Sequence, residues 1–390
     1  MPPAPEAWLA QRPAGLYVHI PFCRKKCAYC DFCSYSGLEA LIPAYVDALI
    51  QETQLRAAAW QGTRFDSLYL GGGTPSLLAP EQVDRLLRAI RQRLDLDLRA
   101  EITIEANPGT VGREQLAALC QAGINRLSLG FQSLQAGELT LLGRIHDTQT
   151  ALGAFHDARR AGFANLSLDL MFGLPHQTLD AWRDTLRQVV ALAPEHLSLY
   201  ALTVEAGTPL AQSINQGRLP HPDDDLATDM YELAQETLAR AAMEQYEISN
   251  WAAGPNLVSR HNLHYWHNER YLGLGAAATS YDGLDRATHT PDPTAYIAEI
   301  SRGALRYAEV ERPSREQRMD ETMMLGLRLT EGVARNAFRE RFGVEMEAVY
   351  RQAIGDLVEA NLLESDDRGI RLSPPGRLLG NRVFGRFLRE

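Results

Sequence analysis

The sequence predicts an α/β fold built on a parallel sheet, followed by a small, mainly helical C-terminal domain. Six short β-like runs alternate with amphipathic helical segments over the first 245 residues, the alternation then stops, and a helical pattern returns from residue 304. Strands that alternate with helices are joined by right-handed crossovers and lie parallel in one sheet. The spacing alone does not separate an open doubly wound sheet from an incomplete barrel.

The predicted strands and helices follow one another along the first 245 residues. The strands are residues 16–22, 67–70, 101–106, 126–131, 165–171 and 196–202. The helical segments are residues 40–60, 81–95, 112–122, 148–161, 178–193 and 224–243. In the second helical segment Val83, Leu86, Leu87 and Ile90 recur at helical spacing, which predicts one apolar face turned towards the sheet.

The remaining chain divides into two parts. Residues 246–303 are rich in aromatic residues, Asn, His, Gly and Pro, so we expect a connecting segment that is loop-dominated at 250–295. Residues 304–390 are expected to form the C-terminal domain, with its clearest helices at 321–329 and 346–360 and a short strand near residue 370. The predicted domains are therefore 1–245, 246–303 and 304–390.

Composition narrows the class of protein. The 390 residues are 45% hydrophobic and 23% charged, which is ordinary for a globular chain. The net charge of -10 argues against a nucleic-acid partner, which would need a basic surface. No stretch approaches the roughly 20 apolar residues that span a bilayer, and the first residues lack a signal-peptide pattern. We expect a cytoplasmic protein.

Four of the five cysteines lie within eleven residues, and the fifth, Cys120, stands alone in a predicted helix. Cys23, Cys27 and Cys30 have the spacing C-x-x-x-C-x-x-C directly after the first strand. A loop of this kind can wrap three thiolates around one cubic iron–sulfur cluster and leave one iron open. A reduced surface loop or a zinc site is the alternative. Cys120 is expected to be a buried apolar thiol.

Polar residues and glycines gather where the predicted strands end. Gly71-Gly72-Gly73-Thr74-Pro75 follows the second strand; glycines allow a ligand to approach the backbone, although such a triplet alone often marks only a turn. Later strand ends carry Glu105, Gln132, Arg144 and Asp169. A carboxylate in a buried strand is costly unless it is paired or binds a ligand. An ion pair of Arg144 with Asp169 or Glu105 is the structural alternative.

These motifs resemble those of the radical S-adenosylmethionine (SAM) superfamily. The context Tyr17-Val-His-Ile-Pro-Phe-Cys23 and Tyr29-Cys30-Asp31-Phe32 is similar to the branch that contains oxygen-independent coproporphyrinogen III dehydrogenases and HemW-type haem chaperones. The resemblance implies a partial (β/α)6 radical-SAM barrel. It also implies a [4Fe–4S] cluster on Cys23, Cys27 and Cys30, with SAM on the open iron.

The same resemblance assigns residues to SAM. It matches Gly72, Gly73 and Thr74 to the element that holds the SAM amino group. It maps Tyr17, Glu105, Gln132, Arg144, Asp169 and Ala201 onto further SAM contacts. Ribose hydroxyls would suit Glu105 or Asp169, and the planar guanidinium of Arg144 would suit a carboxylate.

Two departures favour the chaperone branch. The dehydrogenases carry a further cysteine two residues after the third, where this chain has Phe32, with Cys33 one step later as a bystander. They also carry a longer N-terminal extension. His261-Asn-Leu-His264-Tyr-Trp266 matches the HNxxYW signature of the HemW branch, in which the histidine is proposed as a haem ligand. Core packing of this segment is the alternative, and His264 or His267 could take the place of His261.

The resemblance therefore implies a chaperone that binds haem and passes it to a haem-requiring acceptor, of which a respiratory enzyme is the expected kind. It allows a homodimer and peripheral membrane contact through partners. Whether SAM is cleaved stays open. The alternative function is oxidative decarboxylation of coproporphyrinogen III to protoporphyrinogen IX by radical SAM chemistry.

Overall fold

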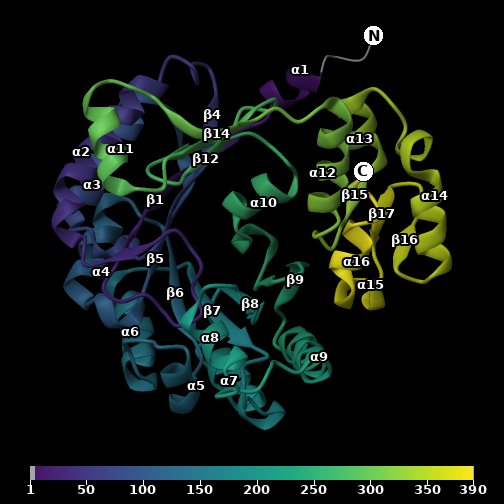
Figure 1. Cartoon of the computed structure of the whole chain (residues 1–390), viewed down its shortest axis with the longest axis horizontal. Coiled ribbons are helices and arrows are strands. Elements are labelled where there is room, and N and C mark those ends of the chain that lie inside the picture. The colour runs from purple at the N-terminus through teal and green to yellow at the C-terminus, as the bar shows by residue number, and fades with distance from the viewer. Residues whose placement is uncertain (1–4, 390) are drawn as a thin grey trace.

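A large sheet dominates the computed structural model, which describes residues 5–389 (Figure 1). Its centre consists of six parallel strands in chain order, each paired with the next. They are β1 (Ala14–Ile20), β4 (Arg64–Gly72), β5 (Asp95–Ala106), β6 (Arg126–Gln132), β7 (Leu166–Phe172) and β8 (His196–Ala201). This arrangement confirms the α/β class and the partial six-stranded barrel.

Helices cover the convex face of these strands (Figure 1). They are α2 (Ile42–Arg56), α3 (Pro80–Arg93), α4 (Arg113–Ala122), α6 (Thr148–Ala161) and α7 (Leu179–Ala191), with α9 (Asp224–Arg240) packed against α7. Capping side chains and glycines determine where helices begin and end, as α6 shows. In α6 the Asp147 side chain accepts a hydrogen bond from the Thr150 amide, and Gly162 ends the helix with a φ of 106°.

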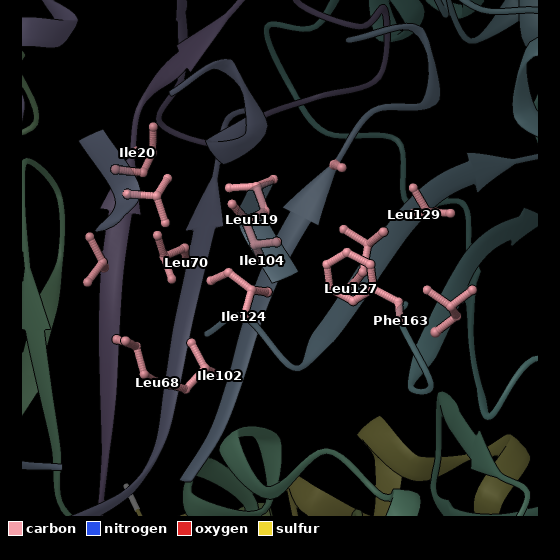
Figure 2. Close-up of a cluster of buried hydrophobic side chains, with 14 of the residues drawn as sticks. Ile20, Leu68, Leu70, Ile102, Ile104, Leu119, Ile124, Leu127, Leu129 and Phe163 are labelled. Atoms are coloured by element: carbon pink, nitrogen blue, oxygen red, sulfur yellow. The ribbon is translucent and has the colours of Figure 1, made fainter. Parts of the chain in front are cut away.

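The core lies between these helices and the sheet. Figure 2 shows Leu68, Leu70, Ile102, Ile104 and Leu127 on neighbouring strands, facing Leu119 of α4, and all are nearly or fully buried. Burying one such side chain contributes about 1.5–3 kcal/mol. Because side chains alternate along a strand, the residues between these positions point to the concave face, where they are free to be polar.

The structure corrects the expectation that residues 250–295 are mainly loop. Strands β11 (Tyr271–Leu274), β12 (Thr279–Tyr281), β13 (Arg286–His289) and β14 (Tyr307–Glu311) extend the sheet beyond β1. At the other edge, β10 (Asn250–Ala252) and β9 (Glu244–Glu247) follow β8. These strands have three to five residues, which is too short for alternation to be recognised. The pairing with a preformed sheet, rather than local sequence, defines them.

One helix from this region lies on the inner side of the barrel. Helix α10 (Arg260–Trp266) contacts β1 and β4 on one side and α12 on the other. In Figure 1 it stands between the sheet and the C-terminal helices. The HNxxYW residues are therefore placed at the junction of the barrel with the C-terminal part of the chain.

The C-terminal part is mainly helical, as expected, and has its own apolar cluster around Met323 and Phe338. It contains α12 (Arg315–Gly326), α13 (Arg335–Phe342), α14 (Met346–Glu359), α15 (Pro374–Leu378) and α16 (Gly380–Phe384). A small sheet joins β15 (Val333–Ala334), β17 (Gly369–Leu372) and β16 (Leu363–Ser365). The helix expected at 321–329 begins earlier, because Ser314 and Gln317 form a capping box. The boundaries at residues 245 and 303 stay a prediction.

Within residues 5–389, no helix has the length and apolar character to cross a bilayer.

Candidate functional site

A cavity of about 400 Å³ opens at the carboxyl ends of the parallel strands. This volume lies in the range of small-molecule sites. Its wall contains most of the residues that the sequence singled out, namely Cys23, Cys27, Cys30, Gly72, Gly73, Thr74, Glu105, Gln132, Arg144, Asp169 and Ala201. Tyr17 and His261 are not among the lining residues.

The cysteine loop is clamped at both ends. Cys23 ends β2 (Phe22–Cys23), which pairs with β3 (Tyr35–Ser36). In the middle of the loop, the Ala28 amide donates to the Leu142 carbonyl at 3.0 Å, and the Ala28 carbonyl accepts from the Leu210 amide at 2.8 Å. Leu210 belongs to α8 (Pro209–Asn215) and lies in a small apolar cluster on which Ala28 packs. The loop is therefore held at its ends by its own strand pairing and in its middle by contacts with the barrel loops.

The three thiols belong to residues that line the same cavity. The Cys23 sulfur lies 3.5 Å from the Thr74 hydroxyl, and burial raises the pKa of Cys23. Within residues 5–389, no three or more His, Cys, Asp or Glu side chains are arranged to hold a metal ion. Ligands to one zinc ion must converge on one atom, whereas a cubane binds each thiolate through a different iron. For a cubane the three thiols need only line one cavity, as Cys23, Cys27 and Cys30 do here.

The two other cysteines lie outside this cavity. The Cys33 sulfur points to the Tyr35 hydroxyl and the Pro291 carbonyl, each at 3.6 Å. Cys120 lies in α4 and packs against the core, but it is only partly buried, so the expectation of a fully buried thiol is wrong.

Glycines bring the loop after β4 against the cysteine loop. A Cβ on Gly73 would lie 2.6 Å from the Phe22 carbonyl oxygen and 3.0 Å from the Cys23 sulfur. Gly72 has a φ of 112°, and a Cβ there would collide with the His19 ring at 2.6 Å. The two glycines are thus required by close approach and by backbone conformation. They leave backbone groups facing the cavity.

Arg144 has no carboxylate partner among residues 5–389 at a salt-bridge distance, so the ion pair with Asp169 or Glu105 is not formed. Its Nη2 donates to the Gly130 carbonyl at 2.8 Å and its Nη1 to the Cys27 sulfur at 3.3 Å. The buried Nε has no hydrogen-bond partner. Arg144 is half-buried, and a buried donor atom without a partner is costly, which makes this guanidinium a candidate for an anionic ligand.

Two carboxyl groups line the same cavity as Arg144. Glu105 accepts a hydrogen bond from the Tyr69 hydroxyl at 2.7 Å and another from the Gly72 amide. Burial raises the pKa of Glu105 to about 7, and the nearby Asp169 adds to the rise. Burial also raises the pKa of Asp169, although the Ser128 hydroxyl donates to it at 2.9 Å. Among residues 5–389 neither group forms a salt bridge, although Arg126 and Arg144 act on Asp169 from a longer distance, so both can accept hydrogen bonds from hydroxyl groups of a ligand.

Gln132 is the one non-glycine residue of the predicted site with a positive φ. Its φ is 65°, and it follows a bulge in the β6–β7 pairing. A Cβ on Gly130 would lie 2.9 Å from the Gln132 side-chain nitrogen, so that the amide covers the Gly130 backbone. The bulge turns this side chain from the sheet into the cavity.

Sequence reasoning missed a layer of small polar residues deeper in the cavity. Ser128, Ser167 and Ser198 lie on adjacent strands, and in register Ser128 pairs with Ser167 and Asp169 with Ser198. Each serine sits between two leucines, in the runs RLSLGF, NLSLDL and HLSLYA. This alternation of period two was the available signal, because it places the serines on the face that bears Asp169.

The remaining two predicted residues, Tyr17 and His261, lie beside the cavity wall. The Tyr17 hydroxyl lies 2.9 Å from His19 Nδ1, and its ring stacks on Tyr69. His261 is 1% exposed, as the core-packing alternative for this segment expects. Its Nδ1 lies 3.1 Å from the Ser67 hydroxyl and its Nε2 lies 3.0 Å from the Tyr265 hydroxyl. Both ring nitrogens are therefore occupied.

The other histidines of this segment differ in their partners. His264 is buried between Asp66 and Glu269, at 2.6 and 2.8 Å. Burial opposes its charge, but these two carboxylates prevail and raise the pKa of His264 to about 9. His267 follows α10, and its ring makes no hydrogen bond within residues 5–389; the Glu331 carboxylate lies 4.0 Å from its Nε2.

The sequence is similar to known proteins over nearly its whole length. The family model for the radical SAM superfamily matches residues 17–189, and that for the HemN C-terminal domain matches residues 314–379. The heme chaperone HemW of Bacillus subtilis is 38% identical, with 96% of this chain and 99% of that protein covered. HemW of Escherichia coli is 37% identical, with 97% and 99% covered.

A mouse relative and a solved structure extend the comparison. The mitochondrial radical S-adenosyl methionine domain-containing protein 1 of Mus musculus is 36% identical, with 96% of this chain and 87% of that protein covered. The structure of coproporphyrinogen III oxidase (HemN) from Escherichia coli, a radical SAM enzyme, matches with a TM-score of 0.84 at 24% identity, covering 98% of this chain and 92% of that chain. This last match shows a shared fold. The chain belongs to the HemW family within the radical SAM superfamily.

Proposed function

We propose that this protein is a haem chaperone, which binds haem and passes it to a haem-requiring acceptor protein. The observation that carries the proposal is the full-length similarity to proteins named heme chaperone HemW, at 35–38% identity. The HNxxYW residues support it, because they stand at the junction of the barrel with the C-terminal part, beside a cavity described below. A respiratory enzyme is the proposed kind of acceptor.

We further propose that Cys23, Cys27 and Cys30 hold a [4Fe–4S] cluster with SAM beside it. The residues present fit these groups: three thiols line one cavity, two glycines leave room next to Cys23, and the Arg144 Nε lacks a partner. When bound, the cluster would supply an open iron for the amino and carboxylate groups of SAM.

The chain's own residues would then orient SAM. Arg144 would bind the carboxylate, and backbone groups of Gly72 and Gly73 with Thr74 would hold the amino group. Glu105 and Asp169 would bind ribose hydroxyls, while Gln132 and Ala201 would line the adenosine. Tyr17 would act through Tyr69, on which it stacks.

Haem titration followed by transfer tests the chaperone function. Anaerobically purified full-length protein is expected to bind haem with a defined stoichiometry and to restore activity to a haem-depleted respiratory enzyme. Free haem at the concentration that dissociates from the chaperone is the control. Absence of haem binding by the wild-type protein would refute the proposed function.

Coproporphyrinogen III decarboxylation is the second candidate, favoured by the TM-score of 0.84 to HemN. Phe32 stands against it, since it occupies the place of the dehydrogenases' further cysteine. An anaerobic assay of reconstituted protein with SAM, a reductant and coproporphyrinogen III separates the two functions. Turnover to protoporphyrinogen IX would favour the enzyme.

A further inference from the structure

A second cavity, of about 510 Å³, lies between α10 and the C-terminal part of the chain. Its walls come from four separate segments. Trp8 of α1 (Pro5–Ala10) and the following Arg12 form one side, and Trp266 and His267 at the end of α10 form another. Residues 322–341 and the turn at 366–371 complete it. The cavity shares no lining residue with the cysteine cavity.

The walls combine aromatic and aliphatic side chains. Trp8, Trp266, Val333, Ala337 and Phe338 line the cavity. Its volume suits a ligand of several fused or linked rings, because drug-sized molecules occupy cavities of about 300–1,000 Å³. Aromatic residues provide large, flat contact surfaces. A planar hydrophobic ligand is therefore the chemistry that these walls favour.

A free imidazole faces this cavity. His267 follows the last turn of α10, and Asn268 next to it has a φ of 51°, which ends the helix and sets the direction of the chain. The His267 side chain is 32% exposed, and its ring nitrogens make no hydrogen bond within residues 5–389. His261 and His264 have both nitrogens occupied. Of the three histidines, His267 is therefore the one whose ring nitrogen is available to bind a ligand.

Two arginines in the wall have no carboxylate partner within 4.0 Å among the described residues. Arg341 is 2% exposed, and its guanidinium donates only to the carbonyl groups of His267 and Asn268, at 3.1 and 2.8 Å. Arg368 is exposed at the rim. The buried Nε1 of Trp266 also lacks a partner. A buried guanidinium without a counter-charge and an unpaired donor both point to an anionic ligand.

We propose that haem binds in this second cavity, with the His267 imidazole as its iron ligand and with its propionates towards Arg341 and Arg368. The proposal rests on the proposed haem-chaperone function and gives that function a site. Neutral imidazole is a common axial ligand of haem iron, and guanidinium groups suit carboxylates. Glu331, 4.0 Å from His267, can approach the second ring nitrogen and orient the ring.

Haem titration of the full-length protein tests the site, read from the Soret band and from the electron paramagnetic resonance of the ferric complex. His267→Ala is expected to lose the histidine-ligated spectrum and to bind haemin at least tenfold more weakly. His156→Ala, which removes an exposed histidine of α6, is the matched control and should bind as wild type. His261→Ala tests the residue that the family resemblance assigns to haem.

Two variants test the location without removing the ligand. Ala337→Trp fills the cavity and should weaken haemin binding at least tenfold, whereas Ala360→Trp at an exposed position should not. Arg368→Glu should weaken binding of haemin but not of its dimethyl ester, which has no propionate charge. Circular dichroism and cluster absorbance establish that each variant is folded.

The outcomes separate this site from the chaperone function. If the wild-type protein binds no haem, the proposed function fails. If the wild-type protein binds haem and either His267→Ala or Ala337→Trp keeps its affinity and spectrum, the function stands and this site is wrong. Loss of the spectrum in His267→Ala, with Ala337→Trp weakened and both controls unchanged, supports the site.

Discussion

The Nη1 of Arg144 lies 3.3 Å from the sulfur of Cys27 and donates a hydrogen bond to it. This contact joins the region that follows β6, the fourth parallel strand, to the cysteine loop, and the same guanidinium has a buried Nε without a partner. One residue can therefore contact both a cluster ligand and a carboxylate held beside the cluster.

We predict that Arg144→Ala weakens SAM binding about tenfold to a hundredfold. A hydrogen bond to a charged group contributes about 1.5–3 kcal/mol, and Arg144→Ala removes the guanidinium proposed to bind the SAM carboxylate. Anaerobic equilibrium dialysis with labelled SAM measures the change, and Arg160→Ala on the exposed face of α6 serves as control. Wild-type SAM affinity in Arg144→Ala, with the cluster intact, would remove this residue from the site.

Cys27→Ser is expected to abolish the visible absorbance of the cluster, because serine is a poor ligand for iron in such clusters and Cys33 points away from the cavity. Cys33→Ser and Cys120→Ser should keep the absorbance. Iron and sulfide analysis after anaerobic reconstitution measures all three. A full cluster in Cys27→Ser, or its loss in Cys33→Ser, would show that the ligand set is different.

Gly73→Ala should displace the cysteine loop, since its Cβ would lie 2.6 Å from the Phe22 carbonyl and 3.0 Å from the Cys23 sulfur. We expect loss of most of the reconstituted cluster and a lower melting temperature. Gly153→Ala in α6 is the matched control, because its Cβ meets nothing within 4 Å and alanine favours a helix by about 1 kcal/mol. A cluster content in Gly73→Ala equal to that of wild type would contradict the close contact.

Between pH 4.5 and 7, the free energy of unfolding should depend on the ionisation of the Glu105 carboxyl group. Its pKa rises from 4.5 to about 7 on folding, so the folded state holds the proton more tightly. The protein without SAM is therefore expected to lose stability as the pH rises through this window. Each pKa unit corresponds to about 1.4 kcal/mol, and with screening by water in the cavity we expect roughly 2 kcal/mol.

Denaturant unfolding of wild type and Glu105→Gln at pH 5 and pH 8 measures this dependence. The variant should become more stable relative to wild type at the higher pH, because glutamine cannot ionise. A constant difference between the two proteins at both pH values would mean that Glu105 ionises in the folded state as it does in water.

Most of the central strands could be predicted because their core-facing leucines, such as Leu127 and Leu168, lie in runs of six or seven residues between clear helices. The edge strands could not be predicted, because they are too short for a sequence pattern. For example, β12 has three residues and is defined by its pairing with β11. The partial barrel itself came from the family resemblance, because spacing alone did not distinguish it from an open sheet.

The same contrast holds for the site. Strand-end residues such as Asp169 could be found because burying a carboxylate in an apolar strand is costly unless it is paired or binds a ligand. The burial of His261 was not predictable, because it depends on contact between α10 and β1, where a Cβ on Gly15 would lie 3.2 Å from the His261 ring. Such contacts join residues far apart in the sequence, so no local sequence pattern predicts them.

One measurement tests the central claim most directly: haem titration and the coproporphyrinogen III assay on the same anaerobically reconstituted sample with SAM and reductant. The account predicts saturable haem binding and no protoporphyrinogen IX. Turnover of coproporphyrinogen III, or a sample with a full cluster that binds no haem, would contradict it.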